Sequence, residues 1–178
     1  MSDTPLPVYV DARKAFVNET SLQGTVEVNK LPRIAACTTD QQGQIWTNLT
    51  FSIDRAGRRR IKGVAQSRLM LTCQRCLEPV ATDLAEDIDL VLVDDEEGAR
   101  QLDKEYEPWI AEDNRIVLAA LLDEQLLLGM PIVSFHETGP CIEKSRYQSA
   151  EQGTDQQDQE PQGSKPFAVL ADFKVERE

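Results

Sequence analysis

The sequence lacks the segments that would place a protein in a membrane or outside the cell. Its longest apolar run, residues 116–122, is far shorter than the roughly 20 residues that a helix needs to cross a bilayer. The N-terminal residues show neither the basic region nor the apolar region of an export signal. We therefore expect a cytoplasmic protein with no membrane partner.

Residue patterns typical of catalysis are also missing from the sequence. With a single histidine, His136, and no glycine-rich phosphate loop, the chain offers neither a Ser-His-Asp arrangement nor a nucleotide-binding motif. The spacing of Cys73 and Cys76 occurs in thioredoxin-like redox proteins, but the sequence lacks the βαβ pattern of that fold. We therefore expect a protein that is not an enzyme and has no small-molecule substrate.

Cysteine is scarce, and four cysteines in 178 residues do not make a disulfide framework. Cys73 and Cys76 stand at C-x2-C spacing, and His136 precedes Cys141 by five residues. Two such pairs are the minimum that a tetrahedral zinc site needs. The sequence thus indicates either a zinc site of Cys73, Cys76, His136 and Cys141 or four ordinary side chains, with Cys37 as a small core residue.

Basic residues are few as well, since 19 Lys/Arg against 31 Asp/Glu give a net charge of -12. A protein that coats nucleic acid over a wide surface normally has the opposite balance. The charges are unevenly placed, because residues 55–75 hold seven Lys/Arg and no acid, whereas residues 77–113 hold fourteen Asp/Glu and two Lys/Arg. Any direct contact with RNA is therefore expected in the basic segment.

The basic segment has two interpretations. Arg60, Lys62 and Arg68 share one face of a predicted strand, and carboxylates on the outward face of the next strand can neutralise them through cross-strand pairs. The tip of the predicted hairpin has no obvious acidic partner, so it is the stronger candidate for contact with RNA or a protein partner. The carboxylates are Asp83, Asp87 and Asp89, and the tip residues are Arg55, Arg58, Arg59 and Arg60.

Apolar periodicity predicts an α+β fold, with a twisted antiparallel sheet of about four to six strands and one main amphipathic helix. The helix covers residues 115–128, with Asp113 or Asn114 as its N-cap and Gly129 at its end. A short helix over residues 12–17 has Asp11 as its N-cap. Strands are predicted at residues 22–28, 44–54, 59–72, 80–93 and 106–111, and a helical turn at 31–36.

Two acidic groups are expected to face solvent. Residues 94–97 are interpreted as a solvated acidic loop. Asp123 and Glu124 are adjacent on the predicted helix and do not share a helix face, so we expect them on its solvent side rather than as an acid–base pair.

The composition changes after residue 143. Residues 144–165 are rich in Gln, Ser, Gly, Asp and Glu and cannot bury enough apolar surface to offset their ordering entropy, which predicts a disordered linker. Residues 166–178 contain a short apolar peptide. Its Phe167, Leu170 and Phe173 suit docking on a partner, or the peptide folds back on its own domain. The predicted α+β domain is then residues 1–143.

Three sequence blocks in this order resemble the YceD family, the proteins named for large ribosomal RNA subunit accumulation. The blocks are LTCQRCLEPV at residues 71–80, DEQLLLGMP at 123–131 and PFAVLADFK at 166–174, and the similarity covers nearly the whole chain. The resemblance implies a bacterial cytosolic protein needed for synthesis, processing or stability of 23S ribosomal RNA. It implies no catalytic residue.

These expectations combine into a non-enzymatic ribosome-biogenesis factor for 23S rRNA precursors or large-subunit assembly intermediates, reached directly or through a protein. An adaptor is favoured, in which the basic tip contacts RNA or ribosomal protein and the apolar peptide docks a partner. The alternative is an acidic protein that regulates a ribonuclease, or another RNA-handling protein, by mimicking RNA. A structural zinc module in a protein complex is a third option.

Overall fold

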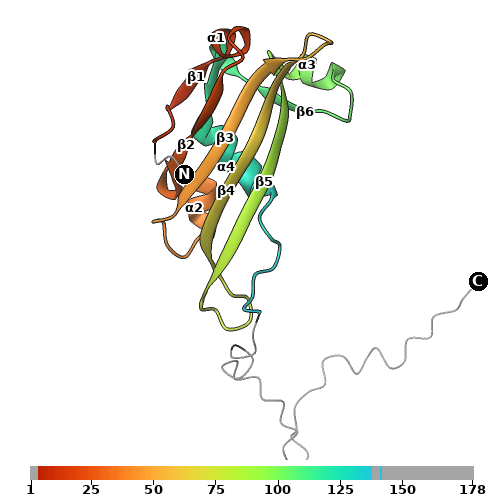
Figure 1. Ribbon diagram of the computed structural model, residues 1–178. Helices are drawn as coiled ribbons and strands as arrows, with labels where there is room; N and C mark the ends of the chain where they lie inside the picture. Colours follow the sequence, from red (N-terminus) through yellow and green to blue (C-terminus); the bar gives the residue numbers. More distant parts are fainter. Residues whose placement is uncertain (1–3, 138–140, 142–178) are drawn as a thin grey trace, which may run out of the picture. The chain divides into compact units, whose positions relative to one another are not determined.

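A curved five-stranded sheet is the frame of the computed structural model, which describes residues 4–137 and residue 141 (Figure 1). The strand order is β2-β3-β4-β5-β6, with antiparallel pairing from β2 to β5. The predicted α+β class is confirmed. The strands are β2 Ser21–Glu27, β3 Gln44–Ile53, β4 Arg59–Thr72, β5 Pro79–Val93 and β6 Glu107–Ile110.

The last strand makes the sheet mixed rather than wholly antiparallel. β6 pairs parallel to β5, with Leu90 opposite Glu107 and Val93 opposite Ile110. Parallel neighbours need a crossover of about a dozen residues, and residues 94–106 provide it. This crossover contains the short helix α3, Glu96–Gln101, where the sequence predicted only an acidic loop. Asp95 caps α3 by accepting a hydrogen bond from the Gly98 N–H at 2.8 Å.

Period-two alternation explains the three long strands. β3 buries Ile45, Leu49 and Phe51, and β4 buries Ile61 and Ala65 on the same face of the sheet. The intervening positions are exposed or half-buried, so one face of the sheet forms the core and the other meets solvent. The β3–β4 connection is the predicted hairpin.

β4 and β5 form a long antiparallel pair whose two ends differ in chemistry. The register runs from Arg59 opposite Leu92 at one end to Thr72 opposite Pro79 at the other. Residues 73–78, which contain the C-x2-C motif, close the pair at the second end. The arginine-rich β3–β4 turn lies at the first end.

The main helix begins three residues later than predicted. α4 covers Leu118–Leu128, and the residues before it form β7, Arg115–Val117, which pairs antiparallel with β1, Tyr9–Asp11. This pairing holds β7 extended, so the helix starts only after it. Asp113 and Asn114 have positive φ angles of 51° and 55° and do not cap α4. Val117 stands at the N-cap and makes no side-chain capping bond.

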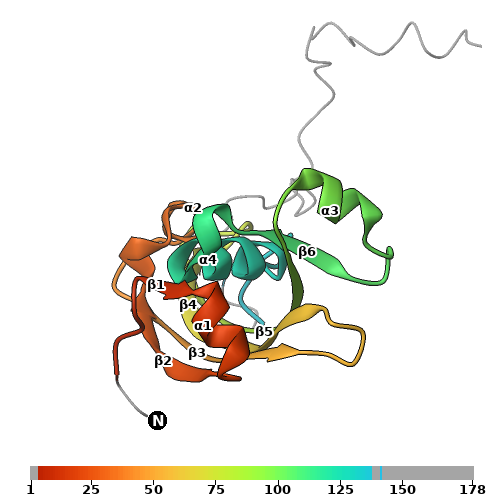
Figure 2. The ribbon, with the colours of Figure 1, turned by 90° about the horizontal axis from the view of Figure 1, so that it is seen from above.

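The core lies between α4 and the sheet. Figure 2 shows α1, α2 and α4 on the same side of the curved sheet. Asp11 caps α1 as predicted, because its Oδ1 accepts a hydrogen bond from the Lys14 N–H at 3.0 Å. α4 buries Leu118, Leu121, Leu122 and Leu126. The remaining short helices are α1 Ala12–Val17, η1 Val28–Lys30, α2 Pro32–Cys37 and η2 Glu112–Asn114.

Asp123 is buried, which corrects the expectation that it faces solvent. Only 4% of the residue is exposed, while its neighbour Glu124 is exposed. The Asp123 carboxylate accepts hydrogen bonds from the backbone N–H groups of Arg33, at 3.1 Å, and Ile34, at 2.9 Å. These are unpaired donors in the first turn of α2, whose own N-cap residue, Leu31, makes no side-chain capping bond. Asp123 therefore caps α2 from another helix.

No helix within the described part of the chain is long and apolar enough to span a membrane. The predicted linker at residues 144–165 and the apolar peptide at 166–178, with Phe167, Leu170 and Phe173, lie outside the described residues.

Candidate metal centre and arginine-rich tip

The C-x2-C motif folds into a tight turn at the end of β4. The Cys73 N–H donates to the Glu78 carbonyl at 2.9 Å, and the Leu77 N–H donates to the Cys73 carbonyl at 2.8 Å. Leu77 adopts a left-handed conformation with φ of 62°, which allows the chain to turn back into β5. Cys73 is fully buried and Cys76 is half-buried.

Residues 132–136 are fixed against this turn by backbone hydrogen bonds. The Gln74 N–H donates to the Ser134 carbonyl at 2.9 Å, and the Gln74 side-chain amide donates to the Ile132 carbonyl at 3.3 Å. Arg75 donates to the His136 carbonyl, and its guanidinium lies 4.6 Å from the centre of the Phe135 ring. These contacts bring His136 to the two cysteines, although 60 residues separate it from Cys76.

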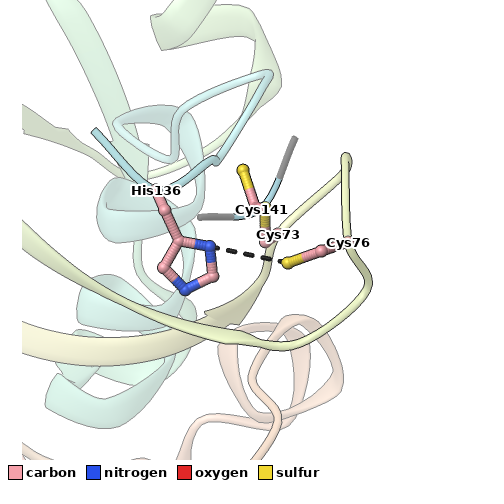
Figure 3. A group of neighbouring side chains, drawn as sticks. All are labelled: Cys73, Cys76, His136 and Cys141. Carbon is pink, nitrogen blue, oxygen red and sulfur yellow. Dashed lines mark hydrogen bonds between the residues drawn. The ribbon is translucent and has the colours of Figure 1, made fainter. Parts of the chain in front are cut away.

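The four predicted ligand residues meet at one point (Figure 3). One ligand atom from each of Cys73, Cys76, His136 and Cys141 lies within 4.8 Å of every other. Zinc–sulfur bonds of about 2.3 Å in a tetrahedron place two sulfurs about 3.8 Å apart, so the cluster is close to the size of a zinc site. Cys141 is buried with 2% exposure, so the thiols of Cys73 and Cys141 are shielded from solvent, whereas the Cys76 thiol and the His136 ring are partly open.

The histidine ring is held in the form that a metal needs. His136 Nε2 lies 3.2 Å from the Pro79 carbonyl oxygen, and Nδ1 lies 3.6 Å from Cys76 Sγ (Figure 3). A carbonyl only accepts, so Nε2 carries the proton and donates it to this bond. The lone pair of Nδ1 is then directed at the thiols, the arrangement that is usual for a metal-bound histidine.

The thiols differ in acidity. Burial raises the pKa of Cys73, but the backbone N–H groups of Cys76, Arg75 and His136 and the Cys76 thiol outweigh it and lower the pKa from 9.0 to about 5. The backbone at Glu78 favours the Cys76 thiolate, yet burial and the neighbouring Cys73 and Cys141 leave the pKa of Cys76 raised. Closely spaced thiolates repel one another, and a bound cation would remove that repulsion.

Cys37 differs from its predicted position. It ends α2 and is exposed, so it is not a small core residue. The cluster of four leaves it out, and this makes Cys37 a natural control for the other three cysteines.

The arginine-rich tip has acidic partners, contrary to the sequence-based expectation. Arg58 Nε donates to Asp54 at 2.7 Å, Arg59 pairs with Asp94 at 2.7 Å, and Arg60 pairs with Asp89 and more distantly with Asp54. The hydrogen bond from Arg58 lowers the pKa of Asp54, and the same contact raises the pKa of Arg58. Arg55 is exposed, and no ion pair links it to another described residue.

Tyr106 is also part of the tip, although no sequence pattern indicated this. The Arg58 guanidinium carbon lies 4.1 Å from the centre of the Tyr106 ring, and that of Arg60 lies 4.9 Å from it. The ring therefore joins two arginines of the β3–β4 hairpin to the segment leading into β6. Sequence spacing held no signal for this contact, because some 46 residues separate Tyr106 from Arg60.

Cross-strand charge pairing on the outer sheet face is confirmed for two of the three predicted carboxylates. Lys62 lies 3.4 Å from Asp89, and Arg68 lies 3.7 Å from Asp83. Asp87 stands opposite Val64 and makes no ion pair within residues 4–137. The two pairs are largely exposed, so each contributes little stability, but together they reduce the positive charge of this face.

Fold and site together define a small α+β domain with one candidate metal-binding cluster in its described residues. The model of the YceD family, described as large ribosomal RNA subunit accumulation protein YceD, matches residues 61–174. The chain belongs to this family. A relative in Haemophilus influenzae, the large ribosomal RNA subunit accumulation protein YceD, is 28% identical over 175 residues, which span 98% of this chain and 99% of the relative. No solved structure matches the chain.

Proposed function

We propose that this protein is a non-enzymatic cytoplasmic factor that supports the accumulation of 23S rRNA, through its synthesis, processing or stability. Family membership over residues 61–174 is the observation that carries the proposal, because the family is named for that role. The match along nearly the whole length of the Haemophilus influenzae relative supports it.

The test is complementation of cells that lack the protein, with the ratio of 23S to 16S rRNA as the readout. Loss of the protein is expected to lower the ratio, and the wild-type chain is expected to restore it. An unchanged ratio in the deletion strain would contradict the proposed function.

We further propose that Cys73, Cys76, His136 and Cys141 bind one structural zinc ion. Three thiols and an imidazole form the donor set of many closed zinc sites, and all four side chains converge here. The ion would join the β4–β5 turn to the residues that follow α4. Metal content of the purified full chain tests this: we expect one zinc per chain, lost in Cys76→Ser and kept in Cys37→Ser. Equal metal content in the two variants would reject the site.

We propose that the arginine-rich tip contacts precursor RNA or an assembly intermediate, and that Arg55 contributes most to this contact. Arg58, Arg59 and Arg60 share their charge with Asp54, Asp89 and Asp94, whereas Arg55 projects from the turn without such a pair among the described residues. Arg55→Glu should lower 23S rRNA accumulation. Arg13→Glu is the matched control, since Arg13 is exposed on α1 and the charge change is the same. Equal complementation by both variants would remove the tip from the proposal.

A second candidate function has its own supporting observation. The ion pairs neutralise most of the basic segment, and residues 4–137 hold fourteen Lys/Arg against twenty-two Asp/Glu. Such a surface suits the regulation of a ribonuclease or another basic RNA-handling protein by mimicry of RNA. A pull-down from cells with and without ribonuclease treatment separates the two. A protein partner that survives ribonuclease and dissociates in salt favours mimicry, whereas precursor RNA that disappears with ribonuclease favours direct contact.

A further inference from the structure

Part of one edge of β5 is unpaired within the described residues. β5 pairs with β4 over residues 79–92, whereas the pairing with β6 on its other edge covers only Leu90 to Val93. The opposite edge of the sheet is different, because residues 4–6 extend it beyond β2. The Leu6 N–H donates to the Thr25 carbonyl at 2.9 Å, and the Thr25 N–H donates to the Thr4 carbonyl at 2.9 Å.

The hydrogen-bond pattern of the β4–β5 ladder shows which backbone groups point to the open edge. The Cys73 N–H donates to the Glu78 carbonyl, so these residues form a hydrogen-bonded pair, and such pairs alternate along an antiparallel ladder. Even-numbered residues of β5 therefore bond to β4, and odd-numbered ones direct their N–H and C=O groups outward. The Pro79 carbonyl agrees with this, since His136 donates to it. Four such residues have no backbone partner at this edge among the described residues: Ala81, Asp83, Ala85 and Asp87.

The open edge borders a cavity of about 630 Å³. Residues 80–83 of β5 line one side, and Pro131 and residues 133–137 line the other. Successive side chains of a strand face opposite sides of a sheet, so a cavity that touches four residues in a row lies at the strand edge. In Figure 1 the chain that follows α4 runs beside this part of β5. The cavity thus lies where a further strand would pair with β5.

The surroundings of this edge combine apolar surface with negative charge. Val133 and Phe135 are each 51% exposed and make the far wall of the cavity apolar. Asp83 and Asp87 stand on the outer face of the sheet, and both are exposed. A strand added here would therefore meet apolar surface with one set of alternate side chains and carboxylates with the other.

We infer that this edge binds an extended, basic segment of a protein partner, in which apolar residues alternate with Lys or Arg. The outward backbone groups of residues 81–87 would supply the hydrogen bonds, and the alternation would supply the specificity. Apolar side chains of the segment would enter the cavity beside Phe135, and its cations would stand next to Asp83 and Asp87. Residues 81–87 offer roughly 23 Å of edge, which suits a segment of about seven residues.

Charge decides between this occupant and two others. Joining the edges of two copies would bring four carboxylates, Asp83 and Asp87 of each, onto one face, and chains with a net charge of -12 repel one another. The same carboxylates would repel RNA phosphates. Basic arms are typical of proteins that bind nucleic acid, so the class of partner, resting on the proposed function, is an RNA-binding protein.

The test uses the full chain and a fluorescent synthetic peptide of about eight residues that alternates lysine and valine. A peptide of the same composition, with its lysines and valines in pairs, is the matched control, because it carries equal charge but mixes both side chains on each face. We expect the alternating peptide to bind at least about tenfold more tightly, measured by fluorescence anisotropy.

Residue-resolved amide exchange then shows where the peptide binds. At saturating alternating peptide, exchange should slow by about tenfold or more at the four outward amides, because they gain hydrogen bonds. Their even-numbered neighbours in β5 already bond to β4 and should change much less. A complex held only by charge would not produce this alternation.

Two variants test the chemistry of the edge. Asp83→Lys should weaken binding of the alternating peptide about tenfold, because repulsion replaces attraction. Asp40→Lys is the matched control, since Asp40 is exposed, lies outside β5 and gives the same charge change, and it should alter the affinity less than about twofold. Ala81→Pro removes one outward N–H without breaking a bond to β4 and should also weaken binding, with thermal unfolding as the check that the variant is folded.

Three outcomes would overturn the inference: equal affinity for the two peptides, binding that leaves exchange at the four outward amides unchanged, or slow exchange at these amides before any peptide is added. The last would assign the edge to a second copy if it depends on protein concentration, and to other residues of the same chain if it does not. The readouts involve neither rRNA nor metal content, so failure of this inference and failure of the proposed function are distinguishable.

Discussion

Different kinds of side chain meet at the two ends of the β4–β5 strand pair. At one end, residues 73–78 and 132–136 converge on four potential metal ligands, two of them buried. At the other, Arg58 and Arg60 lie over the Tyr106 ring, and both pair with Asp54 near the surface. A metal centre contributes many kcal/mol and responds to chelators, whereas ion pairs near the surface contribute less and are screened by salt. With zinc bound as proposed, the cluster end of the strand pair would be the more stable one and the tip end the one that responds to salt.

The largest expected effect is at the cysteine end. Cys73→Ser removes a buried ligand of the proposed zinc ion, and a loss of about 3 kcal/mol would lower the Tm by roughly 10 °C in a domain of this size. Thermal unfolding followed by circular dichroism measures it. Cys37→Ser, at an exposed cysteine outside the cluster, should unfold within about 2 °C of the wild type. Equal shifts for both variants would mean that this end is held by ordinary packing.

Asp123 belongs to neither end and provides a reference for both, because neither salt nor a chelator should change its contribution to stability. Asp123→Ala leaves two N–H groups of α2 without their acceptor and is expected to cost about 2–3 kcal/mol in the free energy of unfolding. Denaturant titration measures this, and the exposed neighbour Glu124→Ala should stay within about 0.5 kcal/mol of the wild type. Similar costs for the two alanines would contradict the capping role.

At the tip we expect an intermediate effect. Tyr106→Leu removes both arginine–ring contacts and should cost about 1 kcal/mol, whereas Tyr106→Phe keeps the ring and should cost less than about 0.5 kcal/mol. Denaturant unfolding of the two variants gives the comparison. If leucine and phenylalanine are equivalent, the ring contributes only hydrophobic area.

The smallest effect concerns pH at the tip. The pKa of Asp54 is lowered from 3.8 in the folded chain by Arg58, so its contribution to stability is present above pH 3.8 and is lost as the pH falls through the lower folded value. Asp54→Asn should flatten the stability profile between pH 4 and pH 2, and it should lower the stability at neutral pH, where the wild-type carboxylate makes its full contribution. A variant that keeps the wild-type slope between pH 4 and pH 2 would assign the slope to other carboxylates.

Sequence periodicity identified the sheet because its long strands each bury one face. β4 has the predicted bounds, and β3 and β5 differ from prediction by one residue at one end. Prediction from local sequence patterns was wrong where tertiary contacts override those patterns. Asp113 and Asn114 are good capping residues, yet pairing of β7 with β1 moved the helix start beyond them. Asp123 looked like a surface residue because its two partners lie some 90 residues away.

The candidate metal cluster could be predicted from ligand types and spacing, but not the contacts that assemble it. Nothing in the sequence indicates that Gln74 and Arg75 bind the backbone of residues 132–136 and thereby place His136. At the tip, the expectation that the arginines have no acidic partner was wrong for another reason. Asp54 directly precedes the arginines, but its pairing with Arg58 depends on the turn geometry, in which the Asp54 side chain also accepts from the Arg58 N–H at 2.9 Å.

Residue-resolved amide exchange of the wild-type chain, under two treatments, tests the difference between the ends most directly. A zinc chelator is predicted to speed exchange at residues 73–78 and to leave Asp54, Arg58 and Arg60 unchanged. About 1 M salt, where the Debye length is about 3 Å, is predicted to do the reverse. If the chelator has no effect at residues 73–78, or if both treatments act equally at both ends, the two ends do not differ in the way proposed.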